Sequence, residues 1–390
     1  MSFTIPATVQ DALHQHLTIE SEYRMRYERR LDRDFNETTR DNRSDAFQRF
    51  RVGARYKDKG PWSGFAQYQY AHGEGWTSTK NGSDESSDLL QLYAQRQTKS
   101  DKITIGRQKI NLGTERLIGS LEWVNRSRSF DAVRFQTALW DVFVARIAVQ
   151  NAQPQKLHIG TVSYASKIGA SSLIHKQQST TAGNVNIMTL DHSMKRNAGT
   201  LELDFEGALQ FGRNLGKDQE AWALHLGATK KLSANSKLTA EWNSASGGGS
   251  ATKSKTFDNL YPTNHKFYGL MDMHAWKNMN QLALTWTTKP RKDLEIKTRV
   301  SKNYLMDSKD AWYGAGGGAN TLAGGVFKDA TGAAGKDLGM EWDLEATWVR
   351  NPKQTISAGI GLYQPGRFVK TLTGKNQAQF FGYLQYAAKF

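Results

Sequence analysis

Residues 338–348 read LGMEWDLEATW, and the two sets of alternate positions in this stretch differ in polarity. One set is apolar and consists of Leu338, Met340, Trp342, Leu344, Ala346 and Trp348. The other set is small or polar and consists of Gly339, Glu341, Asp343, Glu345 and Thr347. A β-strand points successive side chains to opposite faces, so this period of two predicts a strand with one apolar and one polar face.

The same period recurs along the whole chain. Further examples cover residues 17–28, 46–57, 200–211 and 379–390. Taken singly, each such strand fits a soluble β-sandwich as well as a membrane barrel, because either fold gives a strand one apolar face. The repetition therefore predicts an all-β protein, and the connections have to distinguish the two architectures.

The connections between the strands are of two kinds. Short ones lie at 58–61, 289–293 and 351–353, and each contains a proline, which would remove a ladder hydrogen bond inside a strand. Long polar ones lie near 30–45, 72–87, 246–279 and 305–336. Long loops on one side and short turns on the other are the layout of a transmembrane antiparallel β-barrel, with the long loops extracellular and the short turns periplasmic.

We expect about eighteen strands, with sixteen as the second choice. Eighteen strands in 390 residues leave about 22 residues for each strand with its connection, which suits strands of about 10 residues. The alternation is weakest over 157–194, where we predict three short strands near Leu157, Ser171 and Val185. Residues 1–390 are expected to form a single barrel domain, with residues 1–15 as a periplasmic lead-in.

The composition excludes several other classes of protein. There is no cysteine, so the chain has no disulfide scaffold, thiol catalyst or thiolate metal site. No run of about 18 uninterrupted apolar residues is present, which excludes a helical membrane protein. The net charge is +15, but the basic residues are spread along the chain, so we expect no nucleic-acid partner. The first residues lack a basic segment followed by an apolar run, and we expect that a signal peptide has been removed.

The last strand carries the most specific local signal. Residues 379–390 read QFFGYLQYAAKF and alternate up to a terminal aromatic, Phe390. A closing strand of this type resembles the assembly signal of Gram-negative outer-membrane proteins, although an ordinary last strand is the alternative. We therefore predict a multi-pass barrel in the Gram-negative outer membrane, in contact with its lipid and lipopolysaccharide.

Three segments resemble those of a known family. They are GRQKINLGTERLIG (106–119) continuing into LEWVNRSRSFDAVRF (121–135), SASG (244–247) followed by TFDNLYPTNHKFYGLMD (256–272), and DLGMEWDL (337–344). Together they resemble the alginate-export family of outer-membrane proteins, with matching order and spacing over residues 17–390. The resemblance implies a monomeric eighteen-stranded barrel with a constricted, electropositive pore for an anionic polyuronate. One departure is Gly248, which follows Ser246 and Gly247 where the family pattern has Asp.

Basic residues on the inner faces of the strands are the candidate substrate path. Alternation places these inside: Arg24, Arg26, Arg49, Arg51, Arg55, Arg134, Lys297 and Arg299. We expect a water-filled lumen, in which charges cost little desolvation. On the first two strands the basic residues outnumber local acids and predict an uncompensated positive surface. For Lys297 and Arg299 we favour ion pairs with the acidic face of 341–345, worth about 0.2–1 kcal/mol each.

Further arginines lie on or beside a long outer loop that we expect to fold inward and narrow the pore. They are Arg116, Arg126 and Arg128, with Arg134 next to them. Guanidinium forks bind carboxylates with two parallel hydrogen bonds, so these residues are candidate weak sites for an acidic sugar. Arg107 is ambiguous: strict alternation points it outward, whereas a bulge at Gly106 would turn it into the lumen. Contact with lipopolysaccharide phosphates is the competing role for any basic residue at the rim.

The remaining candidates indicate neither an enzyme nor a cofactor site. His225 has inner parity, but no motif supplies the nucleophile and orienting partner that a barrel hydrolase needs. His265 and Asp272 are interpreted as residues that shape a loop. No metal-ligand spacing or nucleotide motif is present. Seven tryptophans are predicted to be interfacial girdle residues: Trp62, Trp140, Trp222, Trp242, Trp286, Trp342 and Trp348.

These observations leave three functional hypotheses open. The first is a passive, anion-selective outer-membrane channel, above all for export of an acidic, alginate-like polysaccharide or oligosaccharide. The second is an uptake porin for small anionic solutes. The third is a barrel enzyme or adhesin that uses the outer loops. Periplasmic secretion partners are compatible with the first hypothesis.

Overall fold

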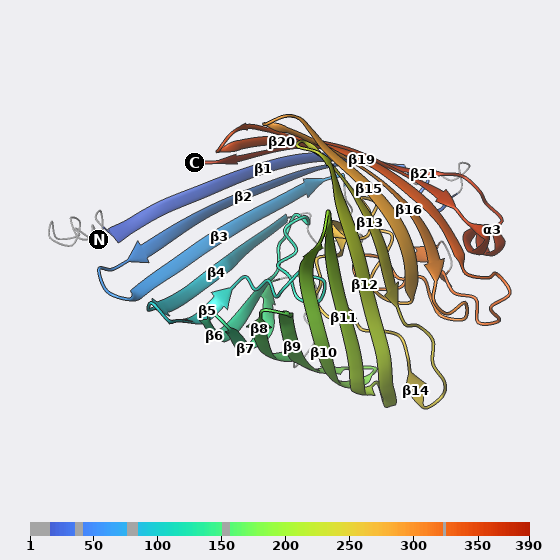
Figure 1. Cartoon of the computed structure of the whole chain (residues 1–390), viewed down its shortest axis with the longest axis horizontal. Coiled ribbons are helices and arrows are strands. Elements are labelled where there is room, and N and C mark those ends of the chain that lie inside the picture. Colours follow the sequence, from blue (N-terminus) through green and yellow to red (C-terminus); the bar gives the residue numbers. More distant parts are fainter. Residues whose placement is uncertain (1–15, 36–41, 76–84, 150–156, 323–324) are drawn as a thin grey trace.

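The computed structural model describes residues 16–35, 42–75, 85–149, 157–322 and 325–390 (Figure 1). Over these residues one sheet contains nineteen strands, of which the two-residue β14 (Lys253–Ser254) pairs in parallel with a loop-end stretch of β12. The other eighteen form a closed antiparallel barrel. The prediction of an all-β barrel with eighteen strands is confirmed, and the second choice of sixteen was wrong.

The barrel strands follow each other around the wall in chain order. They are β1 (Leu17–Leu31), β2 (Arg43–Lys57), β3 (Trp62–Glu74), β4 (Glu85–Gln97), β5 (Asp101–Gln108), β6 (Ser129–Thr137), β7 (Trp140–Val149), β8 (Leu157–Ser166), β9 (Gly169–Thr180), β10 (Gly183–Ala198), β11 (Leu201–Asn214), β12 (Lys217–Ser233), β13 (Ser236–Ala245), β15 (Met279–Arg291), β16 (Leu294–Leu305), β19 (Asp337–Asn351), β20 (Gln354–Pro365) and β21 (Gln379–Lys389). The short elements are η1 (Asn264–Lys266), β17 (Thr321–Leu322), β18 (Gly325–Val326) and α3 (Arg367–Thr373).

Closure of the barrel joins the first and last strands. β1 pairs with β2 along one edge and with β21 along the other, with Glu22 opposite Lys389. The start of β1 and the end of β21 consequently lie together at one end of the barrel (Figure 1). The three strands predicted for the region of weak alternation are present as β8, β9 and β10. The predicted lead-in, residues 1–15, lies outside the described residues.

The two ends of the barrel differ in their connections. The end that holds both termini has only connections of two to four residues, and we call it the turn end. The opposite end, called the loop end, carries the long connections 109–128, 246–278, 306–336 and 366–378. Two connections at the loop end, 181–182 and 215–216, are also short, so the predicted asymmetry holds for most of the barrel and fails at β9–β12.

The predicted alternation between the two faces of the wall is present, except at Leu338, which an irregularity in the pairing of β16 with β19 turns into the interior. On β1, Met25 and Tyr27 are exposed on the outside, whereas Arg24 and Arg26 are buried on the inside. The indole N–H groups of Trp286 and Trp348 donate hydrogen bonds to Ser236 and Asp293 at the turn end, as expected of girdle residues. Among the described residues, no helix is both long and apolar enough to cross a membrane.

The interior of the barrel contains more packed apolar side chains than we expected for a water-filled lumen. Three connections, 109–128, 246–278 and 306–336, contribute buried apolar side chains inside the wall. The first apolar cluster joins loop residues to β6–β13, and its loop members are Ile110, Leu112, Leu117, Ile118, Phe257, Leu260, Tyr261, Tyr268 and Trp276. The second joins other loop residues to β16–β21, and its loop members are Phe35, Leu270, Met271, Trp312, Phe327 and Ala334, with Phe368 and Val369 from α3. The expectation of a simply wet lumen was wrong because these loops bring their own apolar residues inside.

Candidate functional site: the lumen constriction

The connection 109–128 crosses the barrel from one wall to the other. Near one end of the loop, the Arg116 guanidinium lies 3.4 Å from the Glu206 carboxylate on β11. Near the other end, Arg24 on β1 donates hydrogen bonds to the carbonyl oxygens of residues 122–124, over 2.8 to 3.1 Å. The predicted inward fold of this loop is confirmed.

The connections 109–128 and 246–278 form one unit inside the barrel. The Gly119 amide donates to the Tyr261 carbonyl over 2.9 Å, and the Tyr261 amide donates to the Leu117 carbonyl over 2.8 Å. Arg128 lies between the two loops and donates to the carbonyls of Gly119 and Tyr261. Burial lowers the pKa of Arg128 to about 10, which still leaves it protonated at neutral pH.

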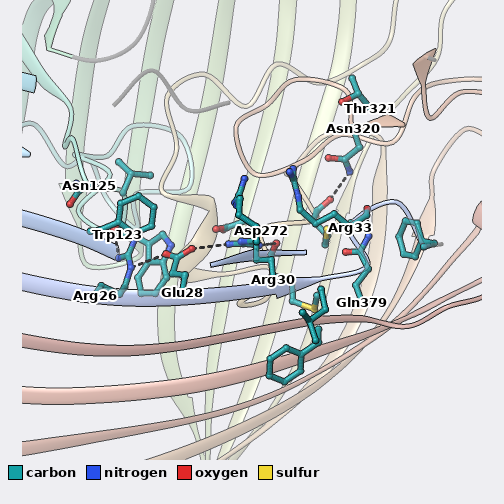
Figure 2. Close-up of a pocket in the computed structure, with 18 of the residues that line it drawn as sticks. Arg26, Glu28, Arg30, Arg33, Trp123, Asn125, Asp272, Asn320, Thr321 and Gln379 are labelled. Atoms are coloured by element: carbon teal, nitrogen blue, oxygen red, sulfur yellow. Dashed lines mark hydrogen bonds and ion pairs between the residues drawn. The ribbon is translucent and has the colours of Figure 1, made fainter. Parts of the chain in front are cut away.

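A cavity of about 340 Å³ opens toward the loop end, between β1, β21 and all three inward connections (Figure 2). Its charged lining consists of Arg26, Arg30, Arg33, Arg43, Glu28 and Asp272. Four arginines and two carboxylates therefore line the cavity, and Arg43 also pairs with Asp45 at 2.7 Å just outside the lining. Side-chain amides of Asn125, Asn320 and Gln379 complete the polar part of the wall.

Glu28 is shared by two of these arginines. The Arg26 Nε atom lies 2.8 Å from one Glu28 oxygen, and an Arg30 nitrogen lies 3.5 Å from the other. Arg30 also donates to the Met271 carbonyl over 3.2 Å and stacks on the Phe381 ring at 4.0 Å. Glu28 therefore holds both guanidinium groups in place in the wall of the cavity.

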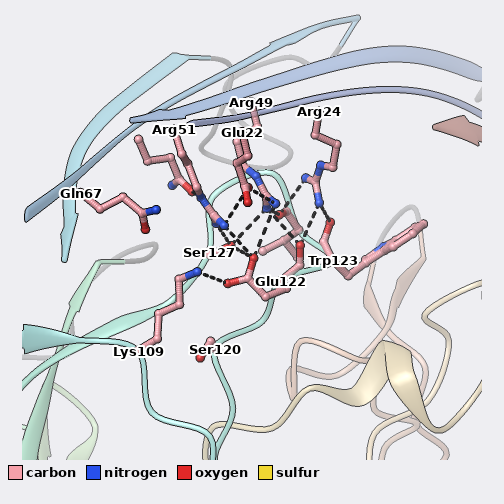
Figure 3. A network of polar contacts seen from close by, with 12 residues as sticks. Glu22, Arg24, Arg49, Arg51, Gln67, Lys109, Ser120, Glu122, Trp123 and Ser127 are labelled. Carbon is pink, nitrogen blue, oxygen red and sulfur yellow. Dashed lines mark hydrogen bonds and ion pairs between the residues drawn. The ribbon is translucent and has the colours of Figure 1, made fainter. Parts of the chain in front are cut away.

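A second group of charges holds the loop against β1 and β2 (Figure 3). Arg49 and Arg51 each lie 3.0 Å from Glu22, and they lie 3.5 and 2.9 Å from Glu122. Lys109 approaches the other Glu122 oxygen at 2.8 Å. The prediction of an uncompensated positive surface on the first two strands was wrong here. The loop 109–128 brings the Glu122 carboxylate into contact with Arg49 and Arg51 and so compensates their charge.

Glu122 is held in its ionised form by this network. Burial by itself would raise its pKa, but the positive charges of Arg51, Lys109 and Arg49 outweigh burial and hold the pKa below its ordinary value. Burial also lowers the pKa of Lys109, and the neighbouring Arg51 lowers it further. The network therefore positions the loop and is not a set of free cations waiting for a substrate.

Trp123, the next residue along the loop, lies inside the barrel between β1, β21 and the loop 246–278. The Arg26 guanidinium lies 3.9 Å from the centroid of its ring, and the His265 ring stacks on it at 3.8 Å with an interplanar angle of 9°. The edge of Trp123 also meets the Tyr383 ring on β21 at 5.0 Å. Arg26, Trp123 and His265 form a three-layer stack that joins β1 to two loops.

His265 is fixed in this stack by Asp272, whose carboxylate lies 2.8 Å from the His265 Nδ1 atom. Burial would raise the pKa of Asp272, but His265, Arg30 and Arg26 together hold it below its ordinary value. The interpretation of His265 and Asp272 as residues that shape a loop is confirmed, because they pair with each other within the loop 246–278. It missed that the segment they shape lies against the constriction.

A second cavity, of about 220 Å³, opens on the turn-end side of the same segment. Its charged lining consists of Lys237, Lys266, Lys297, Arg299, Glu241 and Asp343, and two of these lysines, Lys266 and Lys297, pair with Glu115 and Glu345 outside the lining. His265, Gly269 and Leu270 line this cavity, while Met271 and Asp272 line the loop-end cavity. The segment 265–272 therefore separates the two cavities.

The ion pairs predicted for β16 are present, with one change of partner. Lys297 lies 2.9 Å from Glu345 on β19, as expected for a cross-strand pair. Arg299 pairs with Glu241 on β13, although Asp343 is the residue opposite it in the strand register.

The acidic side chains left over on β19 bind backbone. Glu341 accepts the Met271 amide over 3.0 Å and Asp343 accepts the Leu270 amide over 3.3 Å. Arg299 therefore pairs with Glu241 and not with Asp343, because Glu341 and Asp343 bind backbone amides of the loop 246–278.

Arg107 lies outside the lumen. It is opposite Asp131 in the register, on the same outer face as Ile105 and Val133, and its Nε atom lies 2.8 Å from that carboxylate. Gly106 does have a φ of +121°, but this conformation does not turn Arg107 inward. Including Arg107 in the substrate path was therefore wrong, because the strand period continues through Gly106. A lipopolysaccharide contact remains a prediction for this residue.

The other predicted arginines are distributed over the interior. Arg134 forms a two-point pair with Asp141, at 2.8 and 2.5 Å, close to the turn end. Arg55 also faces the turn end and is 40% exposed, with Glu20 at 3.6 Å. Arg134 was expected beside the outer loop, and that part of the prediction was wrong because β6 carries it away toward the opposite end.

Arg116 and Arg126 connect the loop to the rest of the interior. Arg126 forms a two-point pair with Asp88 on β4, at 2.7 and 2.6 Å. Arg116 donates to the Tyr268 hydroxyl and stacks on the Phe267 ring at 4.0 Å. Like Arg128, these two residues hold the loops in place.

Several residues of the constriction were not singled out from the sequence. Glu122 and Trp123 lie inside the family segment 121–135, which was their only signal. Arg30, Arg33 and Arg43 lie at the edges of a predicted long link, where strand parity gives no guidance.

His225 has the predicted inner parity and is buried between Asp204 and Asn243. No group of three or more His, Asp or Glu side chains in the described ranges could hold a metal ion.

Comparison with known families decides what kind of barrel this is. A family profile described as alginate export matches residues 15–383, which is nearly the whole sequence. The chain belongs to the alginate-export family. No curated protein sequence matches it.

Solved structures agree on the fold. Crystal structures of Pseudomonas aeruginosa OccK5 (OpdH) and of the outer-membrane protein OpdK each give a TM-score of 0.65, at 12% and 10% identity. The alignments cover 96% of this chain and 99% of each of those chains. OccK8 (OprE) of the same species gives 0.64 at 9% identity over 96% of this chain and 98% of its own. At such identities the likeness concerns the fold, and with the family it makes this alginate-export member an outer-membrane channel.

Proposed function

We propose that this channel is passive and anion-selective, and that its cargo is an acidic, alginate-like polysaccharide or oligosaccharide. The observation that carries the proposal is the repeated charge balance of the two cavities. Both the loop-end and the turn-end cavity have four basic side chains and two carboxylates in their lining. Basic side chains therefore outnumber carboxylates in both linings and offer an anion hydrogen-bond donors on either side of the constriction.

Transport needs no chemical step and no cofactor. A uronate carboxylate exchanges its hydration shell and counterion for the basic side chains that line the cavities, such as Arg30, whose guanidinium group can donate to a carboxylate. Glu28 competes for the same donors and keeps each site weak. Sites that attract a carboxylate but release it readily are what diffusion down a gradient requires.

The test is the reversal potential of the purified protein in a planar bilayer under a KCl gradient, repeated with added polyuronate. We expect anion selectivity and a block that increases with polyuronate concentration. Cation selectivity would contradict the proposal, because it would mean that the acidic residues control the field in both cavities.

A second candidate is uptake of small anionic solutes, and the size of the cavities favours it. Volumes of about 340 and 220 Å³ on the two sides of a packed segment suit single acidic sugars better than a continuous polymer. Anion selectivity without polyuronate block would favour this candidate. Swelling of protein-containing liposomes in glucuronate, with no swelling in a uronate trimer, would support it directly.

A further inference from the structure

The lumen around Trp123 is filled by packing in three sectors, two of them apolar and one charged. On the side of β6–β13 the first apolar cluster joins the loops to the wall, and on the side of β16–β21 the second cluster does the same. On the side of β1–β2 the space is taken by Arg49, Arg51 and Glu122 (Figure 3). Ions do not cross dry apolar packing, so conduction is directed to the place where these sectors meet.

The three-layer stack lies at that meeting place. Trp123 packs on the second apolar cluster, and Phe267, two residues after His265, packs on the first. Arg26 and Trp123 line the loop-end cavity, whereas His265 lines the turn-end cavity (Figure 2). The stack therefore lies between the two cavities, with one side lining each.

We propose that the stack of Arg26, Trp123 and His265 is the size filter of the channel, with the Trp123 indole setting the largest anion that passes. This inference rests on the proposed function, since it names the residue that decides between small solutes and longer acidic sugars. The two spacings on either side of the indole are 3.9 and 3.8 Å, which leave no room for a sugar ring while the indole is in place.

The filter is rigid because each layer is held by a separate contact. Arg26 is fixed by Glu28 at 2.8 Å, and His265 by Asp272 at 2.8 Å. Tyr383, which meets the edge of the indole, donates its hydroxyl to Glu345 over 2.9 Å. Rings held in this way cannot tilt freely, so the limit on solute size is set by the structure and not by chance fluctuation.

The experiment compares Trp123→Ala with Trp62→Ala in the full-length protein. Trp62 is exposed on the outer face at the start of β3, so its removal deletes the same side chain without touching the lumen. The readouts are single-channel conductance in planar bilayers and liposome swelling in galacturonic acid, its dimer and its trimer. For Trp123→Ala we expect a conductance increase of about twofold or more and faster entry of the dimer and trimer, with no change for Trp62→Ala.

Unchanged conductance and an unchanged size limit in folded Trp123→Ala protein would overturn the proposal. Folding is checked by heat-modifiable migration in gels and by the β-sheet circular dichroism signal. If Trp123→Ala does not fold, His265→Ala removes the facing layer from the other loop and tests the same filter, with the same expected increase.

The selectivity measurement separates this inference from the proposed function. A channel that is cation-selective but opens on removal of the indole retains the size filter and loses the anion hypothesis. A channel that is anion-selective but indifferent to Trp123→Ala retains the anion hypothesis and loses the filter.

Discussion

The connection 109–128 is attached to the barrel differently on its two sides. Toward β1 and β2, Glu122 and the neighbouring carbonyl oxygens receive the guanidinium groups of three arginines. Toward β6–β8, Ile110 and Ile118 of the same loop pack in an apolar cluster with wall residues that include Phe130 and Phe143. One short segment is thus held by directional charges on one side and by close packing on the other.

The two attachments have different consequences for the channel. Charged contacts fix the position of individual atoms, and loss of one partner leaves the other charge without compensation. Apolar contacts have no preferred direction, and their loss costs in proportion to the cavity left behind. The apolar side fills its part of the lumen with nonpolar side chains, while the charged side keeps polar groups next to the constriction. The following experiments test this division.

The largest effect is expected for Arg51→Met on the charged side. Arg51 is only 1% exposed and bridges Glu22 and Glu122, so its removal leaves two acidic groups undercompensated next to the loop. We expect the free energy of unfolding to fall by about 3–5 kcal/mol, measured by urea unfolding in lipid vesicles with tryptophan fluorescence.

The matched control for this change is Arg55→Met on the same strand. Arg55 is 40% exposed with its nearest carboxylate at 3.6 Å, so the loss should be about 0–1 kcal/mol. Equal losses for the two variants would mean that docking of the loop contributes nothing.

On the apolar side, Ile118→Ala should cause the second-largest loss in the free energy of unfolding. The Ile118 side chain is fully buried where the two inward connections meet, and its removal leaves a cavity that the paired backbones cannot close. We expect a loss of about 3 kcal/mol in the same assay. Ile105→Ala on the outer face is the control, because lipid chains refill that space. An Ile118→Ala loss as small as that of the control would contradict the packing assigned to this side.

A smaller effect is expected where the loop 246–278 meets β19. Gly269 has a φ of +119°, and a Cβ atom there would collide with the Glu341 carboxylate that binds the Met271 amide. Gly269→Ala should therefore cost about 1–3 kcal/mol and raise the noise of the single-channel current.

Gly113→Ala is the control within the loop 109–128. Gly113 also has a positive φ, of +53°, but a Cβ there would meet no atom within 4 Å. A cost for Gly269→Ala no larger than for Gly113→Ala would show that the carboxylate contact on β19 does not hold the loop.

The smallest effect concerns pH. The pKa of Glu122 is below its ordinary value of 4.5, so the stabilisation that its charge provides is complete above that value and is lost as the pH falls through the lowered pKa. Channel conductance should accordingly stay constant from pH 7 to below 4.5 in the wild type. Glu122→Gln removes the charge that holds the loop 109–128 on β1 and β2. This variant should therefore show, throughout that range, the conductance that the wild type reaches only below the lowered pKa of Glu122. Titration of the wild-type conductance near pH 4.5 would contradict the shift.

Much of the wall could be predicted from the sequence because strand parity is a local property. The alternation at 17–28 and 338–348 places Arg26 and Glu341 inside without any knowledge of their neighbours, and the structure agrees. Even the three strands within 157–194, where the alternation is weakest, could be predicted from the local sequence pattern. Arg107 was misplaced only because a possible bulge was given weight against the plain period.

The constriction could not be predicted in this way, because its residues come together across long stretches of chain. Glu122 meets Arg51 from 71 residues away, and eight barrel strands, β6 to β13, lie between Trp123 and His265 along the chain. Whether an inner arginine is free or paired depends on where a loop comes to rest, which no local period encodes.

The sequence by itself determined the barrel, the inner and outer faces and the family, since the spacing of side chains along an extended backbone is set by its covalent geometry. Tertiary structure alone decided which charges are neutralised and which face the cavities, because that balance arises from packing between loops and wall. The physical reason is the range of the interactions: period two acts over adjacent residues, whereas ion pairs and stacked rings act between groups that only the closed barrel brings within a few ångströms of each other.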